Sequence, residues 1–143
     1  MTDLVSDPEP KPHAAAVKAA LDGPTDDMAP AAGARAVVRG LLARCVGDTA
    51  RVQGDAELAV TELVANAIVH ADGLTAFSAD VDHGAARLRL QVEDASREEP
   101  RMIVAAEPGM PGGRGWAIVK RLATTVTVAL LPHGKRITAT FAL

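Results

Sequence analysis

The chain has 143 residues, which is enough for one domain with a hydrophobic core of its own. Apolar residues make up 48% of the sequence and charged residues 23%, a composition typical of a folded globular protein and not of a disordered one. The formal net charge of −3 argues against broad, non-specific binding to nucleic acid, because neutralising phosphates requires a dense basic surface.

The single cysteine and the start of the chain indicate a cytoplasmic protein. Cys45 cannot form an internal disulfide, and its place in an apolar helical pattern predicts a buried thiol, which fits a reducing compartment. No apolar run approaches the roughly 20 residues that cross a bilayer, and the first residues lack the basic start of a signal peptide. We expect a flexible tail over residues 1–12, one domain over residues 13–143, and no membrane association.

The first elements along the chain are an ambiguous stretch and a helix. Residues 14–23, AAAVKAALDG, have the alanines of a helix, but the stretch is short and ends in a turn signal. After Pro30, apolar residues recur at helical spacing until Gly47, where the helix is expected to stop. These apolar residues are Val37, Val38, Leu41, Leu42 and Cys45.

A second helix is predicted from about Asp55, whose side chain can cap it, to about Ala71. Its polar residues Glu62, Asn66 and His70 follow strict i, i+4 spacing and so fall within an arc of about 80°. An ordinary solvated face is the simplest interpretation, yet such faces usually carry Lys and Arg, which this helix lacks. The carboxylate and carboxamide oxygens, one turn apart, suit Mg²⁺; alternatively, Glu62 can accept a proton from a bound water or hydroxyl.

The pattern then changes from helical to alternating. Apolar and polar residues alternate over residues 85–94, which predicts a half-buried strand, and residues 74–82 form a weaker strand before it. The short link makes the two strands antiparallel. Asp94 ends the second strand, where a carboxylate can accept a hydrogen bond from a ligand's amino group, although Asp is also a common turn former.

A long irregular segment follows over residues 95–114, with three prolines and three glycines, and such loops are usually functional or mobile. Gly112, Gly113 and Gly115 allow the backbone to approach a ligand closely, and a helix is predicted to begin directly after them. The N-terminus of that helix favours phosphate, and Arg114 adds a positive charge. Flexibility of the loop alone is the competing explanation for the glycines.

Two further strands are predicted over residues 125–131 and 136–143, joined by a Pro-His-Gly turn. The order of elements is therefore helix, helix, strand, strand, helix, strand, strand. Antiparallel strands with a few separate helices indicate a two-layer α+β sandwich in which the helices cover one face of the sheet.

Three segments together resemble the GHKL ATPase superfamily and, more narrowly, the anti-sigma-factor serine kinases. ELAVTELVANAIVHA, residues 57–71, resembles the N-box of that family. VEDAS, residues 92–96, resembles the start of its adenine-binding G1 box, and GGRGWAIVKRLA, residues 112–123, resembles the G2 box that ends the ATP lid. The resemblance covers roughly residues 14–143.

The resemblance implies a role for each matching residue. Asn66 is expected to ligate Mg²⁺, Glu62 to act as base or water holder, and Asp94 to hydrogen-bond the adenine amino group. The residues expected to contact the phosphates of ATP are Gly113, Arg114 and Gly115.

The resemblance also implies a fold and a function. The fold is a histidine kinase-like ATPase sandwich, with a mostly antiparallel mixed sheet covered on one face by about three helices and with residues 14–23 as an edge strand. The function is that of a Mg-ATP-dependent serine kinase that acts on a STAS-type anti-anti-sigma protein or binds a sigma factor, in some relatives as a homodimer. The alternative is an ATP- or ADP-gated binding module that sequesters its partner without phosphoryl transfer.

Some positions depart from the family pattern. Ala-Ser-Arg occupies residues 95–97, where the family usually has glycines, and Gly-Lys-Arg occupies residues 134–136, where Gly-Lys-Thr is frequent. Trp116 replaces a usual Leu and is expected either to pack under the lid or to contact the ligand. The altered G1 box favours the binding module, whereas the presence of Glu62 and Asn66 favours the kinase.

Overall fold

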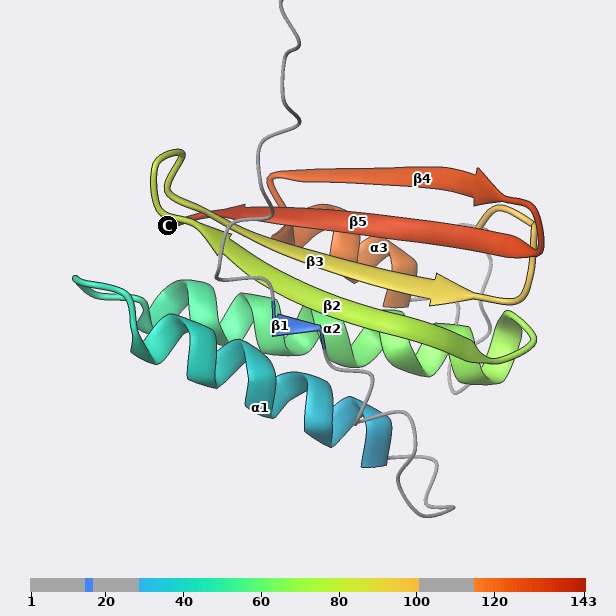
Figure 1. The fold of residues 1–143 in the computed structure, drawn as a ribbon, viewed down its shortest axis with the longest axis horizontal. Helices are drawn as coiled ribbons and strands as arrows, with labels where there is room; N and C mark the ends of the chain where they lie inside the picture. Colours follow the sequence, from blue (N-terminus) through green and yellow to red (C-terminus); the bar gives the residue numbers. More distant parts are fainter. Residues whose placement is uncertain (1–14, 17–28, 101–114) are drawn as a thin grey trace, which may run out of the picture.

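The computed structural model describes residues 15–16, 29–100 and 115–143. Within them, three helices and five strands follow one another along the chain (Figure 1). The elements are β1 (Ala15–Ala16), α1 (Ala29–Ala43), α2 (Ala50–His70), β2 (Leu74–Asp82), β3 (Arg87–Asp94), α3 (Gly115–Leu122), β4 (Thr125–Leu131) and β5 (Gly134–Ala142). None of the described helices is long and apolar enough to span a membrane.

The strands form one sheet in the order β1-β2-β3-β5-β4, and every described pair is antiparallel. The helices lie on one side of this sheet, which confirms the predicted two-layer α+β sandwich (Figure 1). The strand expected over residues 14–23 is present at Ala15–Ala16, where β1 pairs with the edge of β2. The remainder of that stretch lies outside the described residues.

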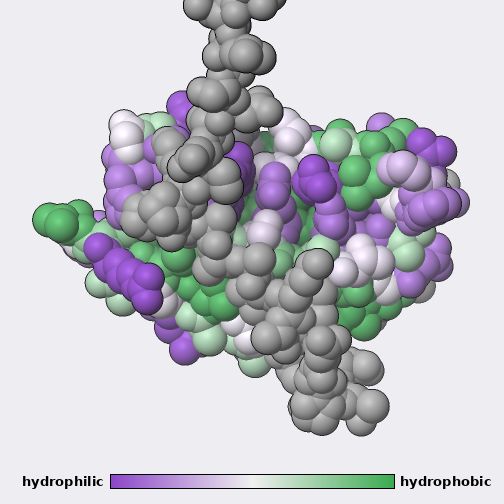
Figure 2. Space-filling view, in the orientation of Figure 1, coloured by the Kyte–Doolittle hydropathy of each residue, from purple (hydrophilic) through white to green (hydrophobic). Residues whose placement is uncertain are grey.

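The core lies between the two layers because the strands alternate as their sequences predict. Leu88, Leu90 and Val92 on β3 are fully buried, and so are Leu63 and Val64 on α2. No described helix lies over the opposite face of the sheet, and hydrophilic residues are present on the part of it that is visible in Figure 2. The sheet therefore has a buried inner face and a solvent-exposed outer face. Successive residues of a strand point to opposite faces, so a residue's position in the strand determines whether its side chain is buried.

Several element boundaries differ from the sequence prediction; helix α1, for example, ends at Ala43, before the stop expected at Gly47. Helix α2 begins at Ala50, so Asp55 lies inside the helix and does not cap it; Thr49 occupies the N-cap position. The earlier start brings Val52 against the hydrophobic core. Strand β5 begins at Gly134, two residues earlier than predicted, because its pairing with β4 continues to Leu131.

Candidate functional site

Helix α2 presents the polar residues that the sequence singled out. Glu62 and Asn66 are half-buried, whereas His70, the last residue of the helix, is exposed. Neither the Glu62 nor the Asn66 side chain hydrogen-bonds to another residue in the described part of the chain. Both side chains therefore keep their oxygens available for a ligand, in a setting less hydrated than an open helix face.

The start of α3 lies directly against Glu62. Gly115, the first residue of α3, is buried, and a Cβ atom placed on it would lie 2.5 Å from Glu62 Oε2. Only a glycine allows this approach without a shift of the carboxylate. Helix α2 and the start of α3, more than 50 residues apart in the sequence, therefore meet, and Glu62 lies at the N-terminal, positive end of a helix dipole. Trp116 is half-buried and packs against the hydrophobic core.

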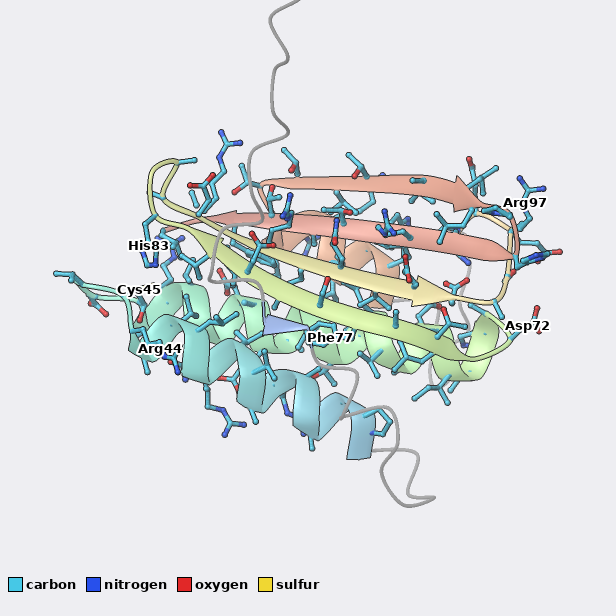
Figure 3. The ribbon with its side chains drawn as sticks, in the orientation of Figure 1. Arg44, Cys45, Asp72, Phe77, His83 and Arg97 are labelled. Carbon is cyan, nitrogen blue, oxygen red and sulfur yellow. The ribbon has the colours of Figure 1, made fainter. Side chains whose placement is uncertain are left out.

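The end of α2 is tied to the residues around Asp94. The Gly73 amide donates a hydrogen bond to the Ala67 carbonyl at 3.0 Å, and the Ala95 amide donates one to the Gly73 carbonyl at 3.1 Å. The connecting turn requires positive φ angles at Asp72 and Gly73, of 61° and 113°. These bonds hold the turn that follows α2 against the end of β3, so the helix turn that carries Asn66 lies at the same end of the molecule as Asp94. Asp72 marks this end in Figure 3.

Asp94 forms a buried ion pair with Lys135. Their side chains are 1% and 2% exposed, and Lys135 Nζ lies 3.0 Å from each carboxylate oxygen of Asp94. Nζ donates a hydrogen bond to Oδ1 and makes an ion-pair contact with Oδ2. Burying two charges is costly unless they compensate each other, so this pair is a strong constraint on the end of β3.

Ser96 completes the surroundings of the pair. Its backbone amide donates to Asp94 Oδ1 at 2.9 Å, and its carbonyl accepts from Lys135 Nζ at 3.2 Å. The next residue, Arg97, donates from Nε to the Leu131 carbonyl at 3.0 Å and lies near the β4–β5 turn (Figure 3). The segment after Asp94, which lacks the family's glycines, is thus folded around the ion pair by its own backbone.

The structure brings two of the predicted site residues, Glu62 and Gly115, into contact and leaves others outside its description. Glu62 meets Gly115, and Asn66 lies on the part of α2 that leads to the Asp94 turn. Gly113 and Arg114 lie outside the described residues, so their predicted phosphate contacts stay predictions. Among the described residues there is no group of three or more His, Cys, Asp or Glu side chains that could hold a metal ion by itself. An ion held by Asn66 therefore needs water or phosphate oxygens to fill its shell, as Mg²⁺ ordinarily does.

Lys135 is the functional candidate that sequence reasoning missed. It is in phase with Ile137, Ala139 and Phe141, the inward-facing residues of β5, so the alternation of that strand already places its side chain inside. A lysine is rarely fully buried unless it has a partner. A lysine in phase with core residues was therefore the available signal.

A separate cavity of about 310 Å³ opens beside the first turn of α2, at the other end of that helix from Asn66. It is lined by Asp48, Thr49, Arg51, Val52, Asp55, Leu122, Thr124, Phe141, Ala142 and Leu143. None of the predicted site residues lines it, so it is distinct from the Glu62–Asp94 region.

Comparison with known proteins places the fold in a family. A model described as "Histidine kinase-like ATPase domain" matches residues 25–141. Among solved structures, the chain is similar to the histidine kinase domain from the Erythrobacter litoralis EL346 blue-light activated histidine kinase, with a TM-score of 0.50 and 20% sequence identity. The match covers 79% of this chain and 60% of that one, and at this identity it shows the fold alone. None of the curated proteins compared with the chain matches it significantly.

Proposed function

Because the chain belongs to the histidine kinase-like ATPase domain family, we propose that it binds Mg-ATP and transfers the γ-phosphate to a serine of a protein partner. The partner we propose is a STAS-type anti-anti-sigma protein, with a sigma factor as the protein that is sequestered or released. The observation that carries the proposal is the approach of Gly115 to the Glu62 carboxylate, which brings the start of α3 against the helix that bears Asn66.

The proposed roles follow the chemistry of each side chain. Glu62 accepts the proton of the attacking serine hydroxyl, and its carboxylate lies at the positive, N-terminal end of α3. Asn66 supplies one oxygen to Mg²⁺, which when bound neutralises phosphate charge. Phosphoryl transfer needs little covalent chemistry from the protein, so positioning and electrostatics carry most of the rate enhancement.

The remaining proposed contacts hold the nucleotide. Gly113, Arg114 and Gly115 contact the phosphates through backbone amides and one guanidinium, and Asp94 accepts a hydrogen bond from the base. These assignments rest on the family pattern. The buried position of Asp94 at the strand end supports the last of them, because one of its carboxylate oxygens still has acceptor capacity.

Calorimetry with Asn66→Ala tests the metal and nucleotide assignments together. We expect ATP affinity in the presence of Mg²⁺ to fall at least about tenfold, or about 1.4 kcal/mol, because one inner-sphere oxygen is lost. Gln53→Ala is the matched control, since Gln53 is also a half-buried polar residue of α2 but lies about 20 Å along the helix from Asn66. An Asn66→Ala variant that binds Mg-ATP as tightly as the Gln53→Ala control would contradict the assignment.

The second candidate function is a nucleotide-gated binding module without phosphoryl transfer. The segment after Asp94 favours it, because Ala-Ser-Arg at residues 95–97 replaces the glycines that are usual in the family. Incubation with Mg-ATP and purified STAS-domain proteins separates the two functions: phosphoserine on the partner, lost in Glu62→Gln, supports the kinase. Nucleotide binding that changes partner affinity without any phosphoserine supports the module.

A further inference from the structure

Gly115, the first residue of α3, lies at a place where a side chain would collide with the Glu62 carboxylate. We propose that Gly115 is a positioning residue for Glu62. The missing Cβ atom lets the carboxylate occupy the place from which it takes the proton of the attacking hydroxyl group. This role rests on the proposed kinase function, and it is additional to the backbone contact with phosphate that is proposed for Gly115.

The backbone conformation does not require a glycine at the start of α3. The described glycines with positive φ angles are Gly47 and Gly73, and Gly115 is not among them. Gly115 has entered the helix, a conformation that residues with a side chain adopt readily, and alanine favours a helix more than glycine does. The reason for a glycine therefore lies in the surroundings of Gly115.

These surroundings are formed by the side chain of Glu62. The three heavy atoms nearest to the position of a Cβ on Gly115 are Oε2 at 2.5 Å, Cδ at 3.4 Å and Cβ at 3.5 Å, and all three belong to Glu62. Ordinary van der Waals contact begins at about 3.4 Å. A methyl group on residue 115 therefore displaces the carboxylate oxygen by about 1 Å.

The carboxylate moves in response to such a methyl group, and α3 stays in place. Val119 lies one turn after Gly115 on the same face of α3 and is fully buried, and Trp116 packs against the hydrophobic core. The Glu62 side chain is half-buried and forms no hydrogen bond within the described residues, so its end can turn. Moving the end of one side chain costs little stability, because the backbone and the core keep their positions.

A displacement of this size matters for a general base. The base must lie within about 2.6–3.2 Å of the hydroxyl group that it deprotonates, and a misplacement of about 1 Å can lower a rate about 100-fold. Gly115→Ala keeps the backbone amide of the residue, so the proposed phosphate contact is retained. The variant therefore separates the position of the base from the binding of the nucleotide.

The test compares Gly115→Ala with Gly54→Ala, a control on α2 where a Cβ atom meets nothing within 4 Å. The measured rate is that of phosphoserine formation on purified STAS-domain proteins with saturating Mg-ATP. We expect it to fall about 10- to 100-fold in Gly115→Ala and less than about twofold in Gly54→Ala. Calorimetry should give an ATP dissociation constant within about threefold of the unaltered chain, and the midpoint of urea denaturation should not fall. An unchanged rate, or a loss of ATP affinity as large as the loss of rate, overturns the inference and leaves the proposed function standing.

A second background distinguishes positioning of Glu62 from a general structural role of Gly115. In Glu62→Gln the base is absent, and the slow residual transfer is followed by mass spectrometry. We expect Gly115→Ala to lower this residual rate less than about twofold, because the group that it displaces no longer accepts a proton. A comparable loss in both backgrounds shows that the methyl group does not act through Glu62, and it overturns the inference. Absence of phosphoserine with the unaltered chain and every STAS-domain protein overturns the proposed kinase and the inference together.

Discussion

Strands β3 and β5 are joined by two ion pairs at neighbouring positions, and one pair is buried whereas the other is exposed to solvent. The register places Asp94 opposite Lys135 and Glu93 opposite Arg136. The first pair points to the helices and is 1% and 2% exposed; the second points to solvent and its glutamate and arginine are 22% and 40% exposed. The pleat alone causes this difference, since consecutive residues of a strand face opposite sides.

The comparison shows that the same pairing of charges has different consequences in the two places. A buried charge depends on its partner, because its interaction with water has been given up. An exposed charge keeps most of its hydration, so its pair contributes little. Substitutions at these neighbouring positions therefore measure how much of the sheet's stability depends on the inner pair.

The largest effect is expected from Lys135→Met, which leaves the Asp94 carboxylate buried without its cation. Removing one member of a buried ion pair costs about 3–5 kcal/mol of unfolding free energy. Urea denaturation monitored by the fluorescence of Trp116 gives this value directly. The double variant Asp94→Asn with Lys135→Met is the control, because it removes both charges and is expected to recover much of the loss. A single variant as stable as the unaltered chain would show that Asp94 is not charged or not buried.

A somewhat smaller effect is expected from Gly134→Ala, which tests the backbone contact beside the inner pair. A Cβ atom on Gly134 would lie 1.9 Å from the Asp94 carbonyl oxygen, so the strands must move apart locally. Overpacking of this kind costs about 1–3 kcal/mol, and it moves Lys135 with the strand. Gly40→Ala is the control, because a Cβ atom there meets nothing within 4 Å. Equal unfolding free energies of the two variants would contradict the close contact.

A small effect is expected from Arg136→Met on the outer face. Arg136 Nε donates to Glu93 Oε1 at 2.9 Å, but both side chains are partly hydrated. Double-mutant cycles on such exposed pairs give about 0.2–1 kcal/mol, and salt weakens them further. The measurement is the unfolding free energy in low and high salt. A loss comparable to that of Lys135→Met would mean that burial does not explain the difference between the two pairs.

The sequence predicted the fold well where the periodicity is local. The alternation over β3 and the helical spacing on α2 each identify the buried face without knowledge of the partner element. Two features depend on distant contacts and were not evident from local patterns. Helix α2 starts at Ala50 because Val52 reaches the core, and Ala15–Ala16 form a strand, against the helix propensity of alanine, because the edge of β2 is available for pairing.

The candidate site was predictable in its residue types and less so in its contacts. The spacing of Glu62 and Asn66 and the glycines before α3 pointed to a ligand, but the contact of Glu62 with Gly115 depends on the packing of α2 against α3. The partner of Asp94 lies 41 residues further along the chain, on a strand whose register could not be derived from its sequence alone. A lysine on the inward-facing side of a strand indicates that an acidic partner is buried beside it, but the sequence does not show which residue this partner is.

The smallest effect is expected from a third pair, Arg39 with Glu57, which connects α1 and α2 on the surface. Their separation is 2.8 Å, and Glu57 also accepts a hydrogen bond from Gln53. Burial raises the pKa of Glu57. The hydrogen bonds from Arg39 and Gln53 and the positive charges of Arg39 and Arg35 lower it by more, so the pKa lies below its ordinary value of 4.5. A carboxyl group whose pKa is lower in the folded state stabilises the fold at pH values above its unfolded pKa, and this contribution is lost as the pH falls through the folded pKa.

Glu57→Gln tests whether this surface pair acts through its charge. We expect the variant to be less stable than the unaltered chain by under about 1 kcal/mol at pH 7. We expect that difference to shrink as the pH falls through the lowered pKa of Glu57 in the folded state, because the native carboxyl group then becomes protonated in both states. Urea denaturation at several pH values measures both quantities. A difference that stays constant across this range would mean that Glu57 stabilises the α1–α2 contact by packing or neutral hydrogen bonding, and the distinction between inner and outer charges would not extend to the helices.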